Sequence, residues 1–255
     1  MSSFVLCYNN SILSFAIDSV ITKFDTNGNL DYENNYNKLF KLDKYNICIA
    51  QLNNPWLMGA EINNIIIAFN RFSEKKVFSS LEDCCNNFIE FLNDKEVKIF
   101  DNSYHNLEMK LIFFGFGESE DCPNLYEYSF RNFDKNLSCE LIIHHTLENT
   151  TNPFFYWIGD GSEYIQKYIY DSELIYDEIL DIADNNQKIL FQNILNNKVS
   201  LLGSSKDQYH YCIFLIQYVI CKKRLHKSSP TVGNPLYGGY INSLEGFIWV
   251  DQYNT

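Results

Sequence analysis

The stretch SSFVLCYNNSILSFAIDSVITKF, residues 2–24, decides the fold that we predict for this chain. It contains two short apolar runs, Phe4–Tyr8 and Ile12–Ile17, and the polar tripeptide 9–11 separates them. Asn and Ser tolerate the tight turns that join neighbouring strands, and apolar runs of this length are typical of strands. The chain is therefore predicted to begin with two strands that run back on each other.

The segments that follow alternate between strand-like and helix-like patterns. Short apolar runs bounded by turn residues predict strands, whereas apolar residues spaced three and four apart predict helices. The predicted strands cover residues 39–42, 46–52, 108–116, 124–130, 138–145, 154–158, 236–241 and 247–250. The predicted helices cover residues 55–72, 80–91, 162–170, 172–197 and 206–225. This order predicts an α+β fold, a four-layer αββα sandwich in which helices flank two mainly antiparallel sheets.

Two of the predicted helices carry further signals. Ser80 and Asp83 approximate a capping box at the start of the second helix. The last helix, residues 206–225, is apolar almost all round, so we expect it to be buried. A third stretch, residues 20–37, is polar and rich in Asn, and we assign no strand or helix to it.

Composition places the chain among globular proteins. It has 255 residues, of which 46% are hydrophobic and 16% aromatic, enough to bury a full-sized core. No linker, repeat or shift in composition divides it, so we predict a single domain over residues 1–255. Its formal net charge of −12 would repel phosphate backbones. We therefore expect no nucleic acid as a partner.

The sequence also argues against several other classes of protein. Residues 1–18 lack the basic segment of a signal peptide, and polar residues interrupt their apolar run, so we expect no membrane association. The eight cysteines form no Cys-x-x-Cys pair, which indicates reduced thiols in a cytoplasmic protein. The adjacent His144 and His145 would point to opposite faces of a strand and could not share a metal ion. We predict no metal and no cofactor.

Five stretches, in order along the chain, resemble those of a proteasome β subunit, a member of the N-terminal-nucleophile hydrolase superfamily. They are SSFVLCYNNSILSFAIDSVITKF at 2–24, KLFKLDKYNICIAQL at 38–52, LIFFGFGESEDCPNLYEYSF at 111–130, WIGDGSEYIQKYI at 157–169 and SPTVGNPLYGGYINSLEGFIWV at 229–250. The resemblance covers most of the chain and implies the same αββα fold. It leaves out residues 172–206, where we expect an inserted helix.

The resemblance implies a nucleophile at the start of the first strand. Asp18 ends the second strand, and the family's spacing back from it falls on Ser2, the residue exposed when Met1 is removed. Lys38 falls at the family's buried active-site lysine. In such a site the α-amine of the nucleophile, with an ordinary pKa of about 7.7–8.0, takes the hydroxyl proton. The lysine keeps that amine neutral and stabilises the oxyanion, and the carboxylate of Asp18 holds the lysine.

The chain departs from the family's pattern at three places. Asp160, between two glycines, stands where the family has Gly-Ser-Gly, and we expect its carboxylate to raise the pKa of the amine and oppose Lys38. Residues 52–54 replace the glycine whose N–H forms the oxyanion hole. In the family an Asp and a Ser precede the last hairpin. Their positions fall near Ser229 and Val232 in this chain, so both family residues are lost. These departures put catalysis in question and leave the fold prediction intact.

Two functions follow from the resemblance. The first is a proteasome-like amidohydrolase or peptidase, with Ser2, Asp18, Lys38 and Asp160 as site residues and a peptide or amide as substrate. The alternative is a non-catalytic subunit of the same fold that serves as a structural or interaction protein. In both cases we expect a homo-oligomer. The first function requires removal of Met1, because Ser2 has no free amine while Met1 is attached.

Overall fold

The structure is a computed structural model that describes residues 2–24, 30–94, 108–133, 136–148, 153–170, 204–226, 231–242 and 246–253. The chain forms two compact units. The first unit combines both ends of the chain, Met1–Tyr36 and Thr150–Thr255, and the second is Asn37–Asn149. The helix predicted at 172–197, and with it most of the expected insertion, lies outside the described residues.

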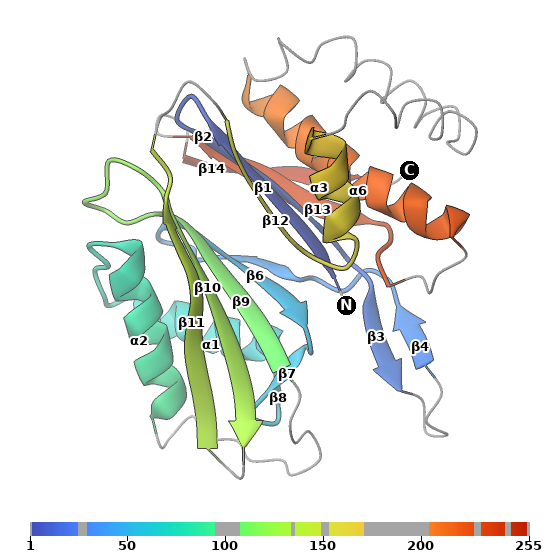
Figure 1. Ribbon diagram of the computed structural model, residues 1–255. Coiled ribbons are helices and arrows are strands. Elements are labelled where there is room, and N and C mark those ends of the chain that lie inside the picture. Colours follow the sequence, from blue (N-terminus) through green and yellow to red (C-terminus); the bar gives the residue numbers. More distant parts are fainter. Residues whose placement is uncertain are drawn as a thin grey trace. The chain divides into compact units, whose positions relative to one another are not determined.

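A five-stranded antiparallel sheet forms the framework of the first unit (Figure 1). In spatial order its strands are β12 (Phe154–Gly159), β1 (Ser3–Asn9), β2 (Ile12–Asp18), β13 (Leu236–Asn242) and β14 (Gly246–Tyr253). The predicted N-terminal hairpin is confirmed, because β1 and β2 pair from Phe4 opposite Ile17 to Asn9 opposite Ile12.

A two-residue turn joins β1 to β2. Asn10 and Ser11 have φ angles of 51° and 62°. Positive φ at both central residues is typical of a type I′ turn, whose twist matches that of the paired strands. Asn adopts positive φ more readily than most residues. The short polar turn thereby fixes the register that carries the start of the chain into the sheet.

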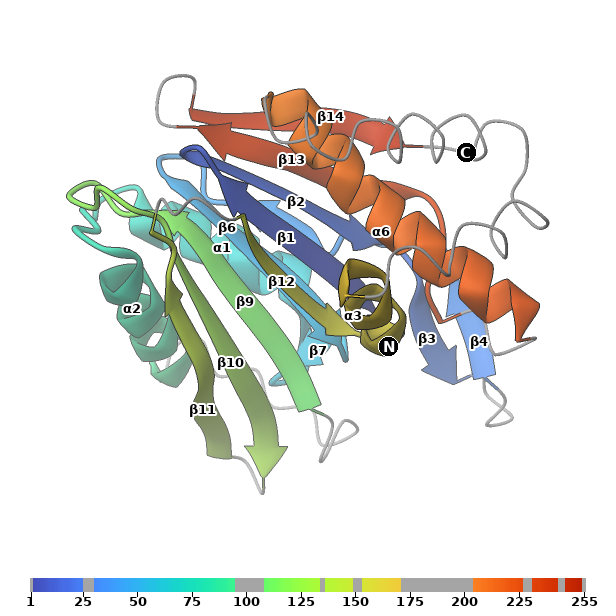
Figure 2. The same cartoon turned by 45° about the horizontal axis from the view of Figure 1, so that its top comes forward.

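Two described helices cover one face of this sheet. The helix α6 (Ser205–Leu225) lies across β1, β2 and β13 (Figure 2). It is buried almost all round, as predicted, and Ser204 caps it by accepting the N–H of Asp207 at 3.1 Å. The shorter α3 (Ser162–Tyr170) packs on α6, where the rings of Tyr168 and Tyr218 lie 5.3 Å apart.

The Asn-rich stretch after β2 contains a small hairpin that the sequence analysis did not predict. Its strands are β3 (Ile21–Phe24) and β4 (Leu30–Glu33), paired from Ile21 opposite Glu33 to Phe24 opposite Leu30. Ile21, Thr22 and Phe24 are residue types that favour strands, and the surrounding asparagines obscured this signal. After β4, the N–H of Tyr36 donates to the carbonyl of Ser19 at 3.1 Å.

The second unit is also built on a five-stranded antiparallel sheet. In spatial order its strands are β11 (Asn136–Thr146), β10 (Asn124–Phe133), β9 (Glu108–Phe116), β6 (Asn46–Asn53) and β5 (Leu39–Lys41). Each was predicted within a few residues of these bounds. The helices α1 (Ile62–Ser73) and α2 (Leu81–Asn93) cover one face of the sheet, and aromatic rings fill the space between. The ring centre of Phe88 on α2 lies 4.9 Å from that of Phe69 and 5.3 Å from that of Phe113 on β9.

The predicted start of α1 was wrong. We predicted a helix from residue 55, but it begins at Ile62, because the residues before it form a hairpin of β7 (Trp56–Leu57) and β8 (Ala60–Glu61). Met58 and Gly59 make its turn, with φ angles of 54° and 78°. The start of α2 is confirmed, since the hydroxyl of Ser80 accepts the N–H of Asp83 at 3.0 Å.

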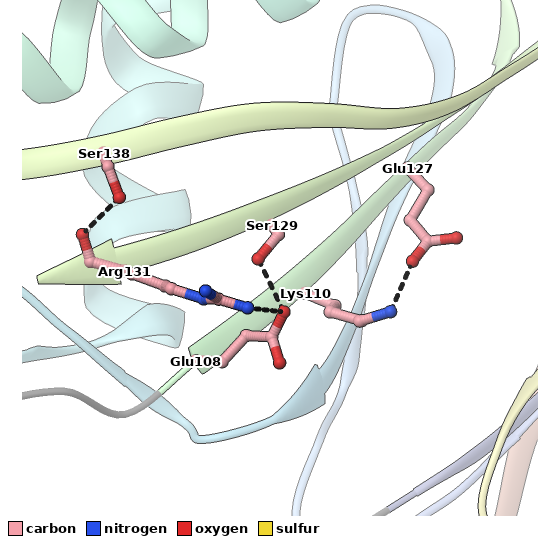
Figure 3. Close-up of polar contacts among 6 residues, drawn as sticks. All are labelled: Glu108, Lys110, Glu127, Ser129, Arg131 and Ser138. Atoms are coloured by element: carbon pink, nitrogen blue, oxygen red, sulfur yellow. Dashed lines mark hydrogen bonds and ion pairs between the residues drawn. The ribbon is translucent and has the colours of Figure 1, made fainter.

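A polar network lies on β9 and β10 of the second unit (Figure 3). Lys110 donates to the buried Glu127 at 2.8 Å. The carboxylate of Glu108 accepts the hydroxyl of Ser129 at 2.7 Å and the guanidinium of Arg131 at 3.3 Å. The hydrogen bond from Ser129, followed by Arg131, holds the pKa of Glu108 below its usual value. These side chains alternate along the two strands and so share one face.

The described residues therefore form an α+β protein with two five-stranded antiparallel sheets and four helices, α1, α2, α3 and α6. All eight cysteines are free thiols, and burial raises the pKa of Cys7 to about 12. Within the described ranges, no helix combines the length and the apolar character that a membrane span requires.

Candidate active site

Ser2 lies immediately before β1 in the first unit. Ser2 is 1% exposed. The carbonyl of Ser2 accepts the N–H of Asp160 at 2.8 Å, and the next residue, Ser3, lies opposite Gly159 of β12. A backbone hydrogen bond to the turn after β12, next to the first residue pair of β1 and β12, thus fixes the position of Ser2. A residue held in this way loses the mobility that is usual at the ends of chains.

Asp18 holds the same strand from the other side. It ends β2 and is fully buried. One carboxylate oxygen accepts the N–H of Ser3 at 2.7 Å, and the other accepts the N–H of Val20 at 3.0 Å. Hydrogen bonds to an ionised acceptor are shorter and stronger than neutral ones. Two predicted site residues, Ser2 and Asp18, are therefore adjacent through the backbone of Ser3.

Asp160 occupies a tight turn between β12 and α3. Its neighbours Gly159 and Gly161 have φ angles of 105° and 85°, a region that residues with a side chain rarely adopt. A Cβ atom on Gly161 would lie 2.3 Å from Cγ1 of Val219, so the turn also presses against α6. The two glycines direct the Asp160 N–H toward the carbonyl of Ser2.

The carboxylate of Asp160 is paired with two side chains that the sequence analysis missed. Its Oδ2 accepts Nζ of Lys223 and the hydroxyl of Thr231, and Lys223 also donates to Oγ1 of Thr231 at 2.8 Å. The side chains of Lys223 and Asp160 are 11% and 16% exposed. The three residues come from the last turn of α6, the turn after β12 and the segment before β13.

Sequence signals for these two residues existed but were indirect. Lys223 belongs to a short basic run at the end of α6, which indicated only a favourable charge at a helix C-terminus. Thr231 lies between Ser229 and Val232, the positions to which the family's polar pair was assigned. Val232 is a buried apolar residue, and Ser229 lies outside the described residues. The structure thus brings Thr231 to Asp160 from the expected segment.

Lys38 lies in the second unit, immediately before β5. It is fully buried, and its carbonyl accepts the N–H of Gln51 on β6 at 2.8 Å. Of the four predicted site residues, the structure therefore brings Ser2, Asp18 and Asp160 together within the first unit. Lys38 belongs to the second unit.

The end of β6 adopts a backbone conformation that is usual for glycine. Asn53 has a φ of 68°, the left-handed conformation that glycine adopts freely and that Asn tolerates better than most residues. The side-chain amide of Gln51 donates to the carbonyls of Asn53 and Asn54 at 3.2 and 3.0 Å. The buried Gln51 therefore holds the backbone of Asn53 and Asn54 in place.

The described part of the chain holds no cluster of three or more His, Cys, Asp and Glu side chains arranged to bind a metal ion. His144 instead stacks on Tyr126 with ring centres 4.2 Å apart. Its Nε2 lies 3.3 Å from Oδ1 of Asn124.

No protein-family model and no curated protein matches the chain in sequence. Solved structures do match it. Anbu (ancestral beta-subunit) from Yersinia bercovieri aligns over 97% of this chain and 86% of its own, with a TM-score of 0.52 and 15% identity. Anbu from Hyphomicrobium sp. strain MC1 aligns over 98% and 86%, and its Gly-1 mutant over 99% and 87%. Their TM-scores are 0.44 and 0.45, each at 12% identity. The first likeness supports a proteasome-like fold, as the sequence resemblance implied.

Proposed function

We propose that this chain is a proteasome-like N-terminal-nucleophile hydrolase that cleaves a peptide or amide bond with Ser2, freed by removal of Met1. One observation carries the proposal. Ser2 is held at the start of a sheet strand, with Asp160 bound to its carbonyl and Asp18 bound to the N–H of the next residue. A nucleophile needs such a fixed position, because misplacement by about 1 Å can reduce a rate a hundredfold.

The proposal extends to the arrangement of the whole chain. It takes the two sheets to be stacked between helix layers in a single αββα domain, with Lys38 turned toward Asp18 and Ser2. Chain connectivity supports this role for Lys38. Tyr36 is tied to the carbonyl of Ser19, one residue after Asp18. Lys38 follows two residues later, and two residues of extended chain span about 7 Å.

The chemistry is that of acyl transfer. The Oγ of Ser2 attacks the substrate carbonyl carbon while its proton passes to the α-amine of the same residue. Lys38 stabilises the oxyanion that forms. The amine then gives the proton to the leaving nitrogen, the C–N bond breaks, and an ester to Ser2 remains. Water, deprotonated by the same amine, hydrolyses that ester and restores the hydroxyl.

One observation favours a second function. Ser2 is almost completely buried, and a buried nucleophile cannot meet a substrate unless a path to it opens. The alternative is accordingly a non-catalytic subunit of the same fold that acts through its surface as a structural or interaction protein. Both functions fit a homo-oligomer. Both also fit a cytoplasmic location, where eight free thiols would stay reduced.

The test is hydrolysis by protein with a verified terminus. Intact mass would first establish that Ser2 is the first residue, and a panel of peptide and amide substrates would follow. Ser2→Ala, or extra residues ahead of Ser2, should lower the rate by several orders of magnitude, because one removes the nucleophile and the other the base. Lys38→Ala should be nearly as harmful, and Cys7→Ser should stay close to wild type.

Circular dichroism would show that each variant keeps its fold. Equal rates across the variants would place any activity away from Ser2. No hydrolysis of any substrate by protein with a free Ser2 terminus would support the non-catalytic alternative.

A further inference from the structure

The pair formed by Asp160 and Lys223 lies beside the candidate nucleophile. Asp160 donates its own N–H to the carbonyl of Ser2 at 2.8 Å, so the α-amine of Ser2 and the carboxylate of Asp160 belong to hydrogen-bonded residues. Ordinary bond lengths place these two charged groups within about 11 Å of each other. At that distance, with an effective dielectric constant of about 20, one unpaired charge shifts a pKa by about one unit.

An unpaired carboxylate at this place would hinder catalysis. It would favour the protonated amine, which cannot accept the proton of the Ser2 hydroxyl. The structure pairs that carboxylate with a lysine whose side chain is 11% exposed, and the hydroxyl of Thr231 binds both. The pair is neutral as a whole, and solvent screens it little because both partners are largely buried.

We propose that Lys223 is a positioning residue that cancels the charge of Asp160 at the amine of Ser2, and so keeps that amine able to accept a proton. The proposal rests on the proposed function, in which the amine is the base. It assigns Thr231 a separate part. Its hydroxyl is neutral and bridges the two charged side chains, so it fixes the geometry of the pair and leaves the net charge unchanged.

Charged groups on β2, α3 and α6 fit the same scheme. From β2 comes Asp18, whose partner in the proposed function is Lys38. From α3 comes Glu163, which is exposed and therefore screened. From α6 comes Lys222, whose Nζ lies over the ring of Tyr218 at 5.8 Å. Each buried carboxylate next to the nucleophile thus has a lysine assigned to it, and Lys223 is the one assigned to Asp160.

The experiment measures protonation of the Ser2 amine directly. Full-length protein would be made with a cleavable fusion that leaves Ser2 as the first residue. Trace acetic anhydride would then label the amine between pH 6 and pH 10, and mass spectrometry of the N-terminal peptide would give its apparent pKa. The variants are Lys223→Met, Lys223→Arg, Asp160→Asn and the double variant Asp160→Asn with Lys223→Met. Lys206→Met is the matched control, because it removes one lysine at the far end of α6, about 25 Å away.

Lys223→Met should raise the apparent pKa of the amine by about one unit, which lowers the neutral fraction at pH 7 about tenfold. Asp160→Asn should lower the pKa by a similar amount. The double variant, Lys223→Arg and Lys206→Met should all remain at the wild-type value. If Lys223→Met acted only by disturbing the packing, removing Asp160 as well would not restore the pKa of the amine. Recovery of that pKa in the double variant therefore distinguishes a charge effect from a packing effect.

An unchanged pKa in Lys223→Met, or a raised one that persists in the double variant, would overturn the proposal. So would a wild-type amine that is never labelled in the folded protein, because such an amine is not accessible as a base. The failure of the proposed function has a different signature. Wild-type protein that hydrolyses nothing but shows the expected pattern of pKa values would refute hydrolysis and retain the role of Lys223.

Discussion

Substitution of Gly161 by alanine tests whether the turn at Asp160 is as tightly constrained as the structure indicates. The residue has a φ of 85°, where a side chain costs about 1–2 kcal/mol. The new Cβ would also lie 2.3 Å from Cγ1 of Val219. A valine in a helix has one strongly preferred rotamer, so this methyl group cannot turn aside, and the overlap costs about 1–3 kcal/mol. We expect Gly161→Ala to lower the free energy of unfolding by about 3 kcal/mol.

A second substitution separates the two causes. Val219→Ala removes the methyl group and by itself should cost about 2 kcal/mol through the cavity that it leaves. Combined with Gly161→Ala it also removes the overlap. The double variant should therefore lose about 1–2 kcal/mol less unfolding free energy than the two single variants lose in total. Gly233→Ala is the control, because its φ is outside the left-handed region and its Cβ would meet only a methyl of Val20, at 2.8 Å.

Urea unfolding, followed by circular dichroism and by tryptophan fluorescence, would measure these differences, with the slope against urea checked for constancy. If Gly161→Ala costs no more than Gly233→Ala, the tight constraint that we infer for the turn at Asp160 is wrong. Strictly additive effects of the Gly161 and Val219 substitutions would mean that backbone strain alone explains the cost.

The polar network of the second unit yields two further predictions, both measured by urea unfolding. Lys110→Met should cost about 2 kcal/mol because Glu127 is 1% exposed, whereas Arg131→Met, at a side chain 53% exposed, should change stability by less than about 0.5 kcal/mol. Equal costs would contradict this ranking. Ser129→Ala should cost about 1 kcal/mol at pH 7. Since its hydrogen bond lowers the pKa of Glu108, that difference should persist above the ordinary glutamate value of about 4.3 and shrink as the pH falls below it. A difference that is the same at pH 3 and pH 7 would refute this explanation.

Local signals allowed the prediction of most strands and of the helix starts that a side chain fixes. The turn at Asn10 and Ser11 and the cap at Ser80 depend on neighbours within three residues, and both are confirmed. The prediction of where α1 starts failed because a proline such as Pro55 is equally suited to the first turn of a helix and to the position before a hairpin. Gly59, in the middle of the supposed helix, was the signal that favoured the hairpin.

The candidate site was only partly predictable for a different reason. Asp18 and Asp160 were found through short motifs that keep their spacing along the chain. The contacts of Asp160 are not local, since Lys223 and Thr231 lie 63 and 71 positions further on. No periodicity relates such positions, so only the fold could show that the carboxylate has a cation and a hydroxyl bound to it.

The discontinuity of the first unit has a consequence for how the protein is made. Its sheet joins β1 and β2 to β12 and β13, which follow the whole of the second unit in the chain. A ribosome adding about 5–20 residues per second completes β2 roughly 10–40 s before it reaches β13. The second unit, whose strands all come from one uninterrupted stretch, can fold during that time. The N-terminal hairpin must wait for its partners, so no nascent chain carries the complete surroundings of Ser2.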